Sequence, residues 1–155
     1  MYTHKKSLGQ HFLKDENVIN KIIEVLKEND FTNLLEVGPG AGALTKHLMV
    51  LPYVEFKAVE LDEEKVVYLS KKYPSLADKI IHQSFLDMDK PYDGPFTVIG
   101  NFPYNISTEI VFKVIQHRDR FPELVGMFQK NFAKFEAQVD ADVRAAAPDL
   151  KLAAE

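Results

Sequence analysis

The segment that decides the fold reads Leu34-Leu35-Glu36-Val37-Gly38-Pro39-Gly40-Ala41-Gly42. Its first four residues form a short, mostly apolar run that is typical of a buried strand, and the glycine-rich stretch after it is typical of a turn. Beyond the turn, Leu44 and Leu48 have the spacing of one helical face. The segment therefore predicts a strand, a glycine turn and a helix in succession.

The same alternation continues on both sides. Upstream, apolar residues at helical spacing predict an amphipathic helix over 15–28, with Asp15 as its N-cap and Asn29-Asp30 as its end. Downstream, the pattern predicts strands over 54–59, 79–82, 96–100 and 124–129, a helix over 63–73 that Pro74 stops, a turn over 91–95 and a helix capped by Ser107. Strands that alternate with helices form a parallel sheet covered on both faces. We therefore expect a doubly wound α/β fold.

Composition narrows the class of protein. The 155 residues, 46% of them hydrophobic, predict a compact globular chain, and the absence of Cys excludes disulfides, thiolate zinc sites and a cysteine nucleophile. No apolar run approaches the roughly 18 residues that span a bilayer, and the N-terminus does not read as a signal peptide, so we expect a cytosolic protein. The net charge of −4 is unusual for a protein that holds nucleic acid by its phosphates.

The glycine turn indicates a cofactor that approaches the backbone closely, because glycine leaves room for that approach. Its G-x-G-x-G spacing differs from the dinucleotide fingerprint G-x-G-x-x-G, and it lacks the G-K-[ST] ending of a phosphate-binding loop. These differences argue against NAD and ATP. The alternative is a glycine-rich loop with only a structural role.

Glu60 ends the second predicted strand, 22 positions beyond Gly38. This is close to the spacing of about 20 at which an acidic residue binds ribose hydroxyls after a glycine turn. An exposed Glu at the end of a strand is the alternative. Together with the turn, Glu60 favours a cofactor that carries adenosine.

A second motif, Gly100-Asn101-Phe102-Pro103-Tyr104-Asn105, follows the fourth predicted strand. The Asn101 side-chain carbonyl and a neighbouring backbone carbonyl can accept hydrogen bonds from an exocyclic amino group, and Tyr104 offers a ring on which a flipped base can stack. The motif indicates a pocket for adenine. An Asx-Pro turn with a packed Tyr is the alternative.

Four motifs in this order resemble the ribosomal RNA adenine dimethyltransferases of the KsgA type. They are Ser7-Leu8-Gly9-Gln10-His11-Phe12-Leu13, Glu36-Val37-Gly38-Pro39-Gly40, Glu60, and Gly100-Asn101-Phe102-Pro103-Tyr104-Asn105-Ile106-Ser107. The resemblance implies a Rossmann-like, S-adenosylmethionine-dependent methyltransferase fold, with a mostly parallel sheet that is truncated before its last strands.

The resemblance also implies roles for individual residues. The residues expected to bind S-adenosylmethionine are His11, Leu13, Gly38, Gly40, Glu60, Ser84, Phe85 and Asn101, and those expected to act on the substrate are Asn101, Pro103 and Tyr104. The family usually has Asn at the position of His11 and Asp at the position of Ser84. Because a serine accepts more weakly from the cofactor's adenine than an ionised group does, we expect a reduced cofactor affinity.

The reaction implied is methyl transfer to adenosines of small-subunit (16S) ribosomal RNA, giving N6,N6-dimethyladenine. Asn101 and the Pro103 main chain would accept from the amino hydrogens while Tyr104 stacks on the base. The partners expected are ribosomal RNA and the small ribosomal subunit, and no metal is expected. Modification of large-subunit (23S) RNA is an alternative within the enzymes.

The resemblance covers about residues 3–130, and the chain then becomes rich in Ala and acidic residues. We therefore expect an incomplete cofactor-binding domain over 1–130 and a separate, helical tail over 131–155. A non-catalytic, truncated or chimeric domain that keeps the methyltransferase fold is the alternative from another class, and the net charge favours it.

Overall fold

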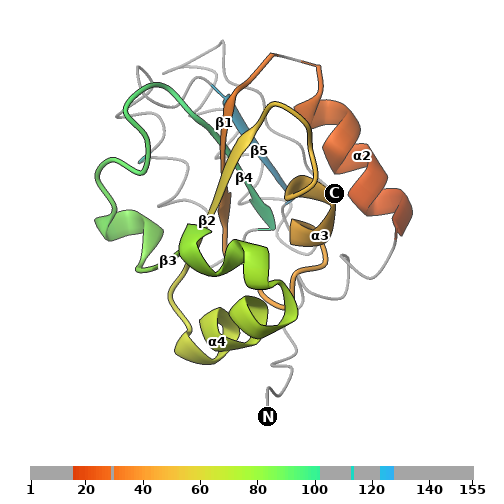
Figure 1. The fold of residues 1–155 in the computed structure, drawn as a ribbon. Helices are drawn as coiled ribbons and strands as arrows, with labels where there is room; N and C mark the ends of the chain where they lie inside the picture. Colours follow the sequence, from red (N-terminus) through yellow and green to blue (C-terminus); the bar gives the residue numbers. More distant parts are fainter. Residues whose placement is uncertain (1–15, 29, 102–112, 114–122, 128–155) are drawn as a thin grey trace, which may run out of the picture.

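The computed structural model describes residues 16–28, 30–101, 113 and 123–127. Their centre is a five-stranded parallel sheet with the strand order β3-β2-β1-β4-β5 (Figure 1). The strands are β1 (Asn33–Val37), β2 (Glu55–Glu60), β3 (Ile80–His82), β4 (Thr97–Asn101) and β5 (Glu123–Met127). The helices are α2 (Glu16–Leu26), α3 (Thr45–Leu48) and α4 (Glu63–Lys72), with the short 3₁₀ helices η1 (Pro74–Lys79) and η2 (Phe85–Asp87).

The expected alternation of strands and helices is confirmed, with boundaries that differ by a residue or two. The helix predicted over 15–28 ends at Leu26, because the Glu28 N–H bonds to the Val25 carbonyl and tightens the last turn. The helix predicted over 63–73 is α4, where the Asp62 side chain accepts from the Glu64 N–H at 2.9 Å. The predicted cap at Asp15 and the helix after Ser107 lie outside the described residues, apart from Lys113.

One face of the sheet carries a cluster of buried apolar side chains. Side chains alternate along a strand, and the register places Leu34 beside Phe56 on this face. The cluster consists of Ile19, Ile22 and Leu26 from α2, Leu44 and Leu48 around α3, Leu76 from η1, and Leu34, Phe56, Ala58 and Ile99 from the sheet. Each large side chain buried here stabilises the fold by about 1.5–3 kcal/mol.

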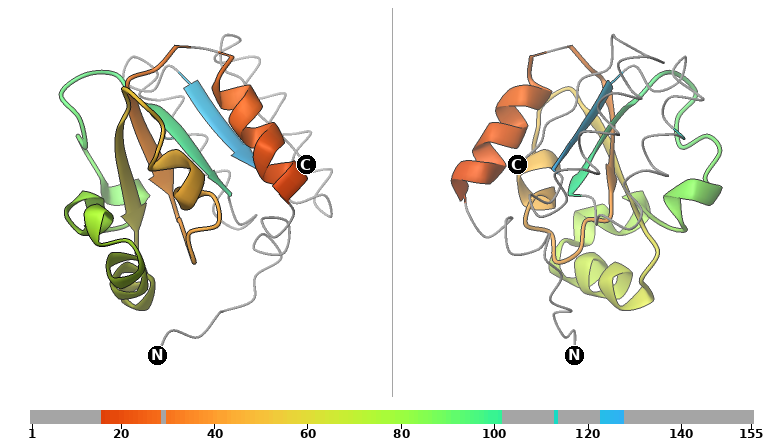
Figure 2. Two further views of the ribbon diagram at one scale, coloured as in Figure 1. Left: turned by 45° about the vertical axis from the view of Figure 1, so that its right-hand side comes forward. Right: turned by 180° about the vertical axis from the view of Figure 1, so that it is seen from behind.

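The segment over residues 83–96 covers the opposite face (Figure 2). Phe85, Met88 and Phe96 are buried in it. The Tyr92 hydroxyl ties the segment to the sheet, because its oxygen lies 2.6 Å from the Leu34 carbonyl oxygen and 2.8 Å from that of Glu55, either of which can accept its one hydrogen. The sheet is therefore covered on both faces, as the doubly wound class requires.

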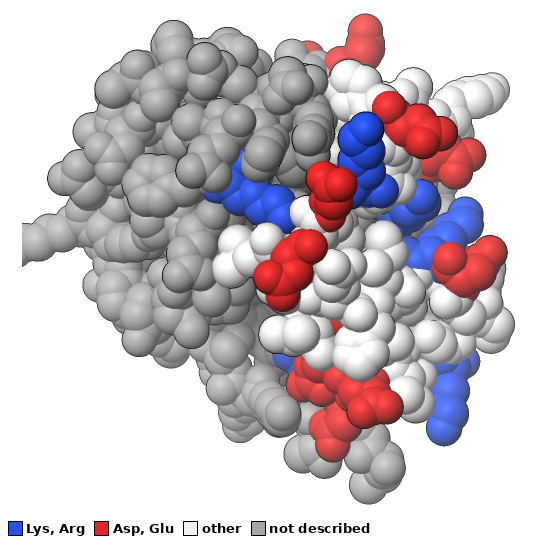
Figure 3. Space-filling view, turned by 90° about the vertical axis from the view of Figure 1, so that its left-hand side faces the viewer, with Lys and Arg blue, Asp and Glu red and all other residues white. Residues whose placement is uncertain are grey.

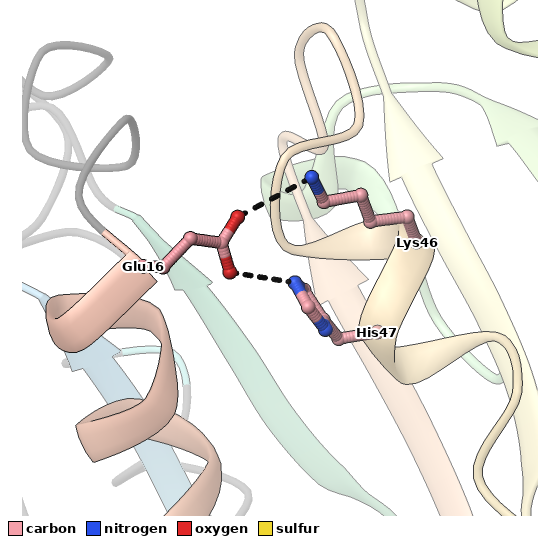
Figure 4. A network of polar contacts seen from close by, with 3 residues as sticks. All are labelled: Glu16, Lys46 and His47. Carbon is pink, nitrogen blue, oxygen red and sulfur yellow. Dashed lines mark ion pairs between the residues drawn. The ribbon is translucent and has the colours of Figure 1, made fainter.

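A small polar contact joins α2 to α3 on the first face. The Glu16 carboxyl lies 3.4 Å from the Lys46 ammonium and 3.3 Å from Nε2 of His47 (Figure 4).

Within the part of the chain that the structure describes, no helix has the length and apolar character needed to cross a bilayer.

Candidate functional site

The strand order places the candidate site at one edge of the sheet. β1 and β4 are neighbours in the sheet although β2 and β3 separate them in the chain, so the topology reverses between them. Ligands of α/β folds bind at the carboxyl ends of the strands at such a point. Val37 pairs with Gly100, which brings the start of the glycine turn and Asn101 to the same edge.

The three glycines of the turn share a left-handed backbone, with φ of 68° at Gly38, 60° at Gly40 and 90° at Gly42. Their surroundings differ. In the described part of the chain, nothing lies within 4 Å of the position that a Cβ on Gly38 would take, whereas one on Gly42 would lie 3.0 Å from Leu69 and 3.2 Å from Tyr73. Gly38 therefore borders open space at the site, and Gly42 allows the turn to pack against α4.

Glu60 lies against the glycine turn, as its spacing predicts. Its side chain is buried, and its two oxygens accept from the Gly40 N–H at 3.3 Å and from the Asp62 N–H at 3.0 Å. A carboxylate has about four lone-pair positions, so each oxygen can accept once more. Glu60 thus braces the turn and retains the capacity to accept from two hydroxyl groups.

The loop after β3 lies next to the end of β2. The Gln83 N–H donates to the Glu60 carbonyl at 3.1 Å, which brings Ser84 and Phe85 beside the same edge. Ser84 caps η2, because its hydroxyl oxygen accepts from the Leu86 N–H at 3.3 Å, and Phe85 is buried. This arrangement joins Ser84 and Phe85 to Glu60 through the backbone.

Two exposed apolar side chains flank these polar groups, and the sequence interpretation missed both. Leu61 is 66% exposed directly after Glu60, and Leu86 is 38% exposed within η2. A large exposed apolar side chain beside polar groups that hold a ligand can contact the flat face of that ligand. The sequence did offer a signal for both, because Leu61 directly follows Glu60 and Leu86 lies two residues after Ser84, and both Glu60 and Ser84 are expected site residues.

Glu36 was also missed as a site residue. It is buried on β1 and accepts from the Thr45 hydroxyl at 2.6 Å. Burial raises the pKa of Glu36 to about 8, the Thr45 hydrogen bond opposes this shift, and nearby Glu60 adds to it. The raised pKa favours the protonated carboxyl group, and the hydrogen bond to Thr45 connects β1 to the start of α3. The signal was an acidic residue within an otherwise apolar strand.

The structure brings together Gly38, Gly40, Glu60, Ser84 and Phe85. The backbone of Asn101 ends β4 at the same edge, but its side chain is outside the described part. His11, Leu13, Pro103 and Tyr104 also lie outside the described residues. For these positions the expected roles stay predictions.

Comparison with known proteins decides the family. The chain matches the family described as ribosomal RNA adenine dimethylase over residues 1–138. The chain belongs to this family. The dimethylase resemblance deduced from the four motifs is thereby confirmed.

Individual relatives agree. The chain is 48% identical over 133 residues to a protein of Flavobacterium johnsoniae called ribosomal RNA small subunit methyltransferase A. The aligned region covers 84% of this chain and 51% of the relative. The chain thus spans about half the length of the curated dimethylase relatives that it matches.

Solved structures confirm the methyltransferase fold. A dimethyladenosine transferase from Plasmodium falciparum superposes with a TM-score of 0.61 at 29% identity, over 77% of this chain and 44% of that one. The 23S rRNA methyltransferase ErmE superposes with a TM-score of 0.59 at 27% identity, over 70% of this chain and 44% of that one. The dimethylase chain therefore has the Rossmann-like α/β fold that its motif order predicts.

Proposed function

We propose that this chain is the cofactor-binding part of an enzyme that transfers methyl groups from S-adenosylmethionine to N6 of adenosines in small-subunit ribosomal RNA. The observation that supports this most directly is the contact between Gly40 and Glu60 beside the open space at Gly38. At this contact, a backbone that a cofactor can approach closely lies beside a carboxylate that can accept from ribose hydroxyls. Asn101, at the end of β4, lies at the same edge of the sheet.

The residues at this edge fit S-adenosylmethionine. Each Glu60 oxygen has a lone pair left for a ribose hydroxyl, and Gly38 leaves room for the methionine end. Leu61 and Leu86 supply apolar surface for a flat adenine ring, and Ser84 and Phe85 bound the same side. His11 and Leu13 are proposed, from the family resemblance, to contact the methionine end.

When bound, S-adenosylmethionine supplies an electrophilic methyl group on a sulfonium centre. The chain's own contribution is to hold the adenine of the RNA in line with it. Asn101 and the Pro103 carbonyl are proposed to accept from the amino hydrogens, which localises the nitrogen lone pair and stabilises the positive charge that develops there. Tyr104 is proposed to stack on the base, so that orientation supplies much of the rate.

Small-subunit RNA is the proposed substrate, with the small ribosomal subunit as partner. The supporting fact is similarity: the relative called a small-subunit methyltransferase is 48% identical, against 27% for the structure called a 23S methyltransferase. We also propose that the protein acts in the cytoplasm, since a chain without Cys suits a reducing compartment.

A second candidate is a domain that binds the cofactor without productive RNA engagement. The net charge of −4 favours it, as does the surface in Figure 3, where acidic side chains are interspersed with the basic ones of the described part. RNA binding depends on clustered positive charge. We propose that 131–155 is a tail separate from the cofactor-binding part, although the family match includes its first residues, up to 138.

The deciding experiment is calorimetric titration of S-adenosylmethionine, followed by a methylation assay on each ribosomal subunit. We expect a Kd in the micromolar range, about −8 kcal/mol, and methylation of the small subunit alone. Asn101→Ala should abolish transfer and leave cofactor binding mostly intact. Binding without methylation of either subunit would favour the second candidate, and no binding would refute the proposed cofactor.

Ser84→Asp should tighten cofactor binding by about 1 kcal/mol, roughly fivefold, because an ionised acceptor forms a stronger hydrogen bond to the adenine amino group. Asp also caps helices well, so η2 should persist. Ser84→Asn is the matched control, with similar shape and capping but no charge. Equal affinities for the Asp and Asn variants would contradict the explanation by charge.

A further inference from the structure

Lys113 makes a set of contacts that the proposed site does not yet include. In the sequence it lies between β4 and β5. Its ammonium group donates to the carbonyl oxygens of Phe85 and Met88. The same group lies 4.8 Å from the centroid of the Phe85 ring. Lys113 is half-buried.

The two carbonyl groups mark the ends of η2. Phe85 is its first residue, and Met88 is the residue directly after it, whose N–H already bonds to the Phe85 carbonyl at 3.2 Å. The Phe85 carbonyl thus has a partner within η2 as well as Lys113, whereas the Met88 carbonyl lies just past the C-terminal end of η2, where carbonyls lack partners within the helix. Lys113 therefore closes η2 from outside and also interacts with the face of the Phe85 ring.

Because Ser84 caps η2 and Leu86 lies within it, the position of η2 sets where both side chains lie at the cofactor edge. We propose that Lys113 is a positioning residue that holds η2 as the adenine side of the cofactor site. This inference rests on the proposed function, since it assigns the ligand of that same edge. Lys113 follows Asn101 in the same connection from β4, so one segment serves both the proposed methyl-transfer residues and the cofactor's adenine.

The chain contains a matched control in Lys57. Its ammonium group donates to the Pro91 carbonyl and lies 4.6 Å from the Tyr92 ring centroid, so its chemistry is the same. It holds the same loop at the other end, where the Tyr92 hydroxyl bonds to the first residue of β2, Glu55. A loss of general stability would follow from removing either lysine, whereas a loss of adenine positioning would follow only from removing Lys113.

The experiment compares Lys113→Met and Lys57→Met in the full chain. Thermal unfolding measures stability, and calorimetry well below both melting temperatures measures the affinity for S-adenosylmethionine and for 5′-methylthioadenosine, which lacks the amino-acid end. We expect Lys113→Met to weaken both ligands by the same factor, about tenfold or 1.4 kcal/mol. Lys57→Met should lower the melting temperature and leave both affinities within about twofold.

Lys113→Arg keeps a positive group with several donors and should recover most of the affinity, which tests the inference even if the Met variant unfolds. Wild-type affinity in folded Lys113→Met, or equal losses in the two Met variants, would overturn the role of Lys113 alone. An Arg variant that folds but binds as weakly as the Met variant would also overturn it. Failure of the wild-type chain to bind either ligand would instead overturn the proposed cofactor, and this inference with it.

Discussion

At the scale of single residues, Gly38 and Gly42 show that one backbone conformation can serve two purposes. Both have a positive φ, at which an L side chain costs about 1–2 kcal/mol. A methyl group on Gly42 would also press on Leu69 and Tyr73, whereas one on Gly38 would meet no atom of the described residues within 4 Å. The turn is therefore constrained by packing at one end and by ligand access at the other.

Gly42→Ala should accordingly destabilise the fold more than Gly38→Ala does. We expect about 2–4 kcal/mol for Gly42→Ala, from strain and overpacking together, and about 1 kcal/mol for Gly38→Ala, measured by denaturant unfolding. Cofactor affinity should fall for Gly38→Ala. Equal destabilisation by the two variants would contradict this division of roles.

Glu36 predicts a specific pH dependence of stability. Its pKa is raised by burial from 4.5 to about 8, so the folded state binds more protons than the unfolded state between these values. The contribution is fully present below about pH 4.5 and is lost as the pH rises through 8, with a slope of up to about 1.4 kcal/mol per pH unit.

Glu36→Gln keeps the shape and the acceptor for Thr45 without the titrating group. Its free energy of unfolding should therefore vary less between pH 5 and 9 than that of the wild type, measured in denaturant at each pH. Parallel curves for the two proteins would show that Glu36 does not titrate in this range.

The residues of the site differ in how far the sequence could predict them. Gly38, Gly40 and Glu60 could be predicted because parallel neighbouring strands end at the same edge of a sheet. The sequence spacing between the glycine turn after one strand and the acidic residue that ends the next is therefore a reliable signal. The Glu36–Thr45 pair was missed, since it depends on which face of β1 meets α3. Lys113 was missed because the contact joins its side chain to the backbone of a loop 25 residues earlier.

At the scale of elements, hydrophobic period predicted the existence of strands and helices better than their ends. β1 begins at Asn33, one residue before the apolar run, because Asn33 pairs with Glu55 across the sheet and donates to the Pro95 carbonyl at 3.1 Å. η1 and η2 were not predicted, since residues outside them stabilise short 3₁₀ helices. α3 has only four residues, and the helical pattern came from its buried Leu48 together with Leu44, the buried residue directly before it.

The contact between α2 and α3 is expected to contribute little to stability. The Glu16 side chain is 56% exposed, and exposed ion pairs are worth about 0–1 kcal/mol. Glu16→Gln should therefore lower the free energy of unfolding by less than about 1 kcal/mol, and the loss should shrink at high salt. Glu24→Gln, at an exposed position of the same helix, is the control. A salt-independent loss would refute an electrostatic origin.

At the scale of the whole molecule, alternation of elements predicted a parallel sheet but could not specify the strand order. The order β3-β2-β1-β4-β5 arises because the chain returns to the other side of β1 after β3. That reversal depends on which strands pair. Leu34 of β1 pairs with Phe56 of β2 on one side and with Thr97 of β4 on the other, and no local sequence pattern encodes this choice. It is nevertheless what brings the glycine turn and Asn101 to one edge.

The central position of β1 has a kinetic consequence. With β2 on one side, β4 on the other and buried side chains at its centre, its amide hydrogens can meet solvent only when much of the sheet opens. β3 is three residues long, lies at an edge and is partly exposed, so its amides open locally. Deuterium should therefore enter β3 first and β1 last, so that the strand leading into the glycine turn stays closed while the edge strand before Ser84 opens.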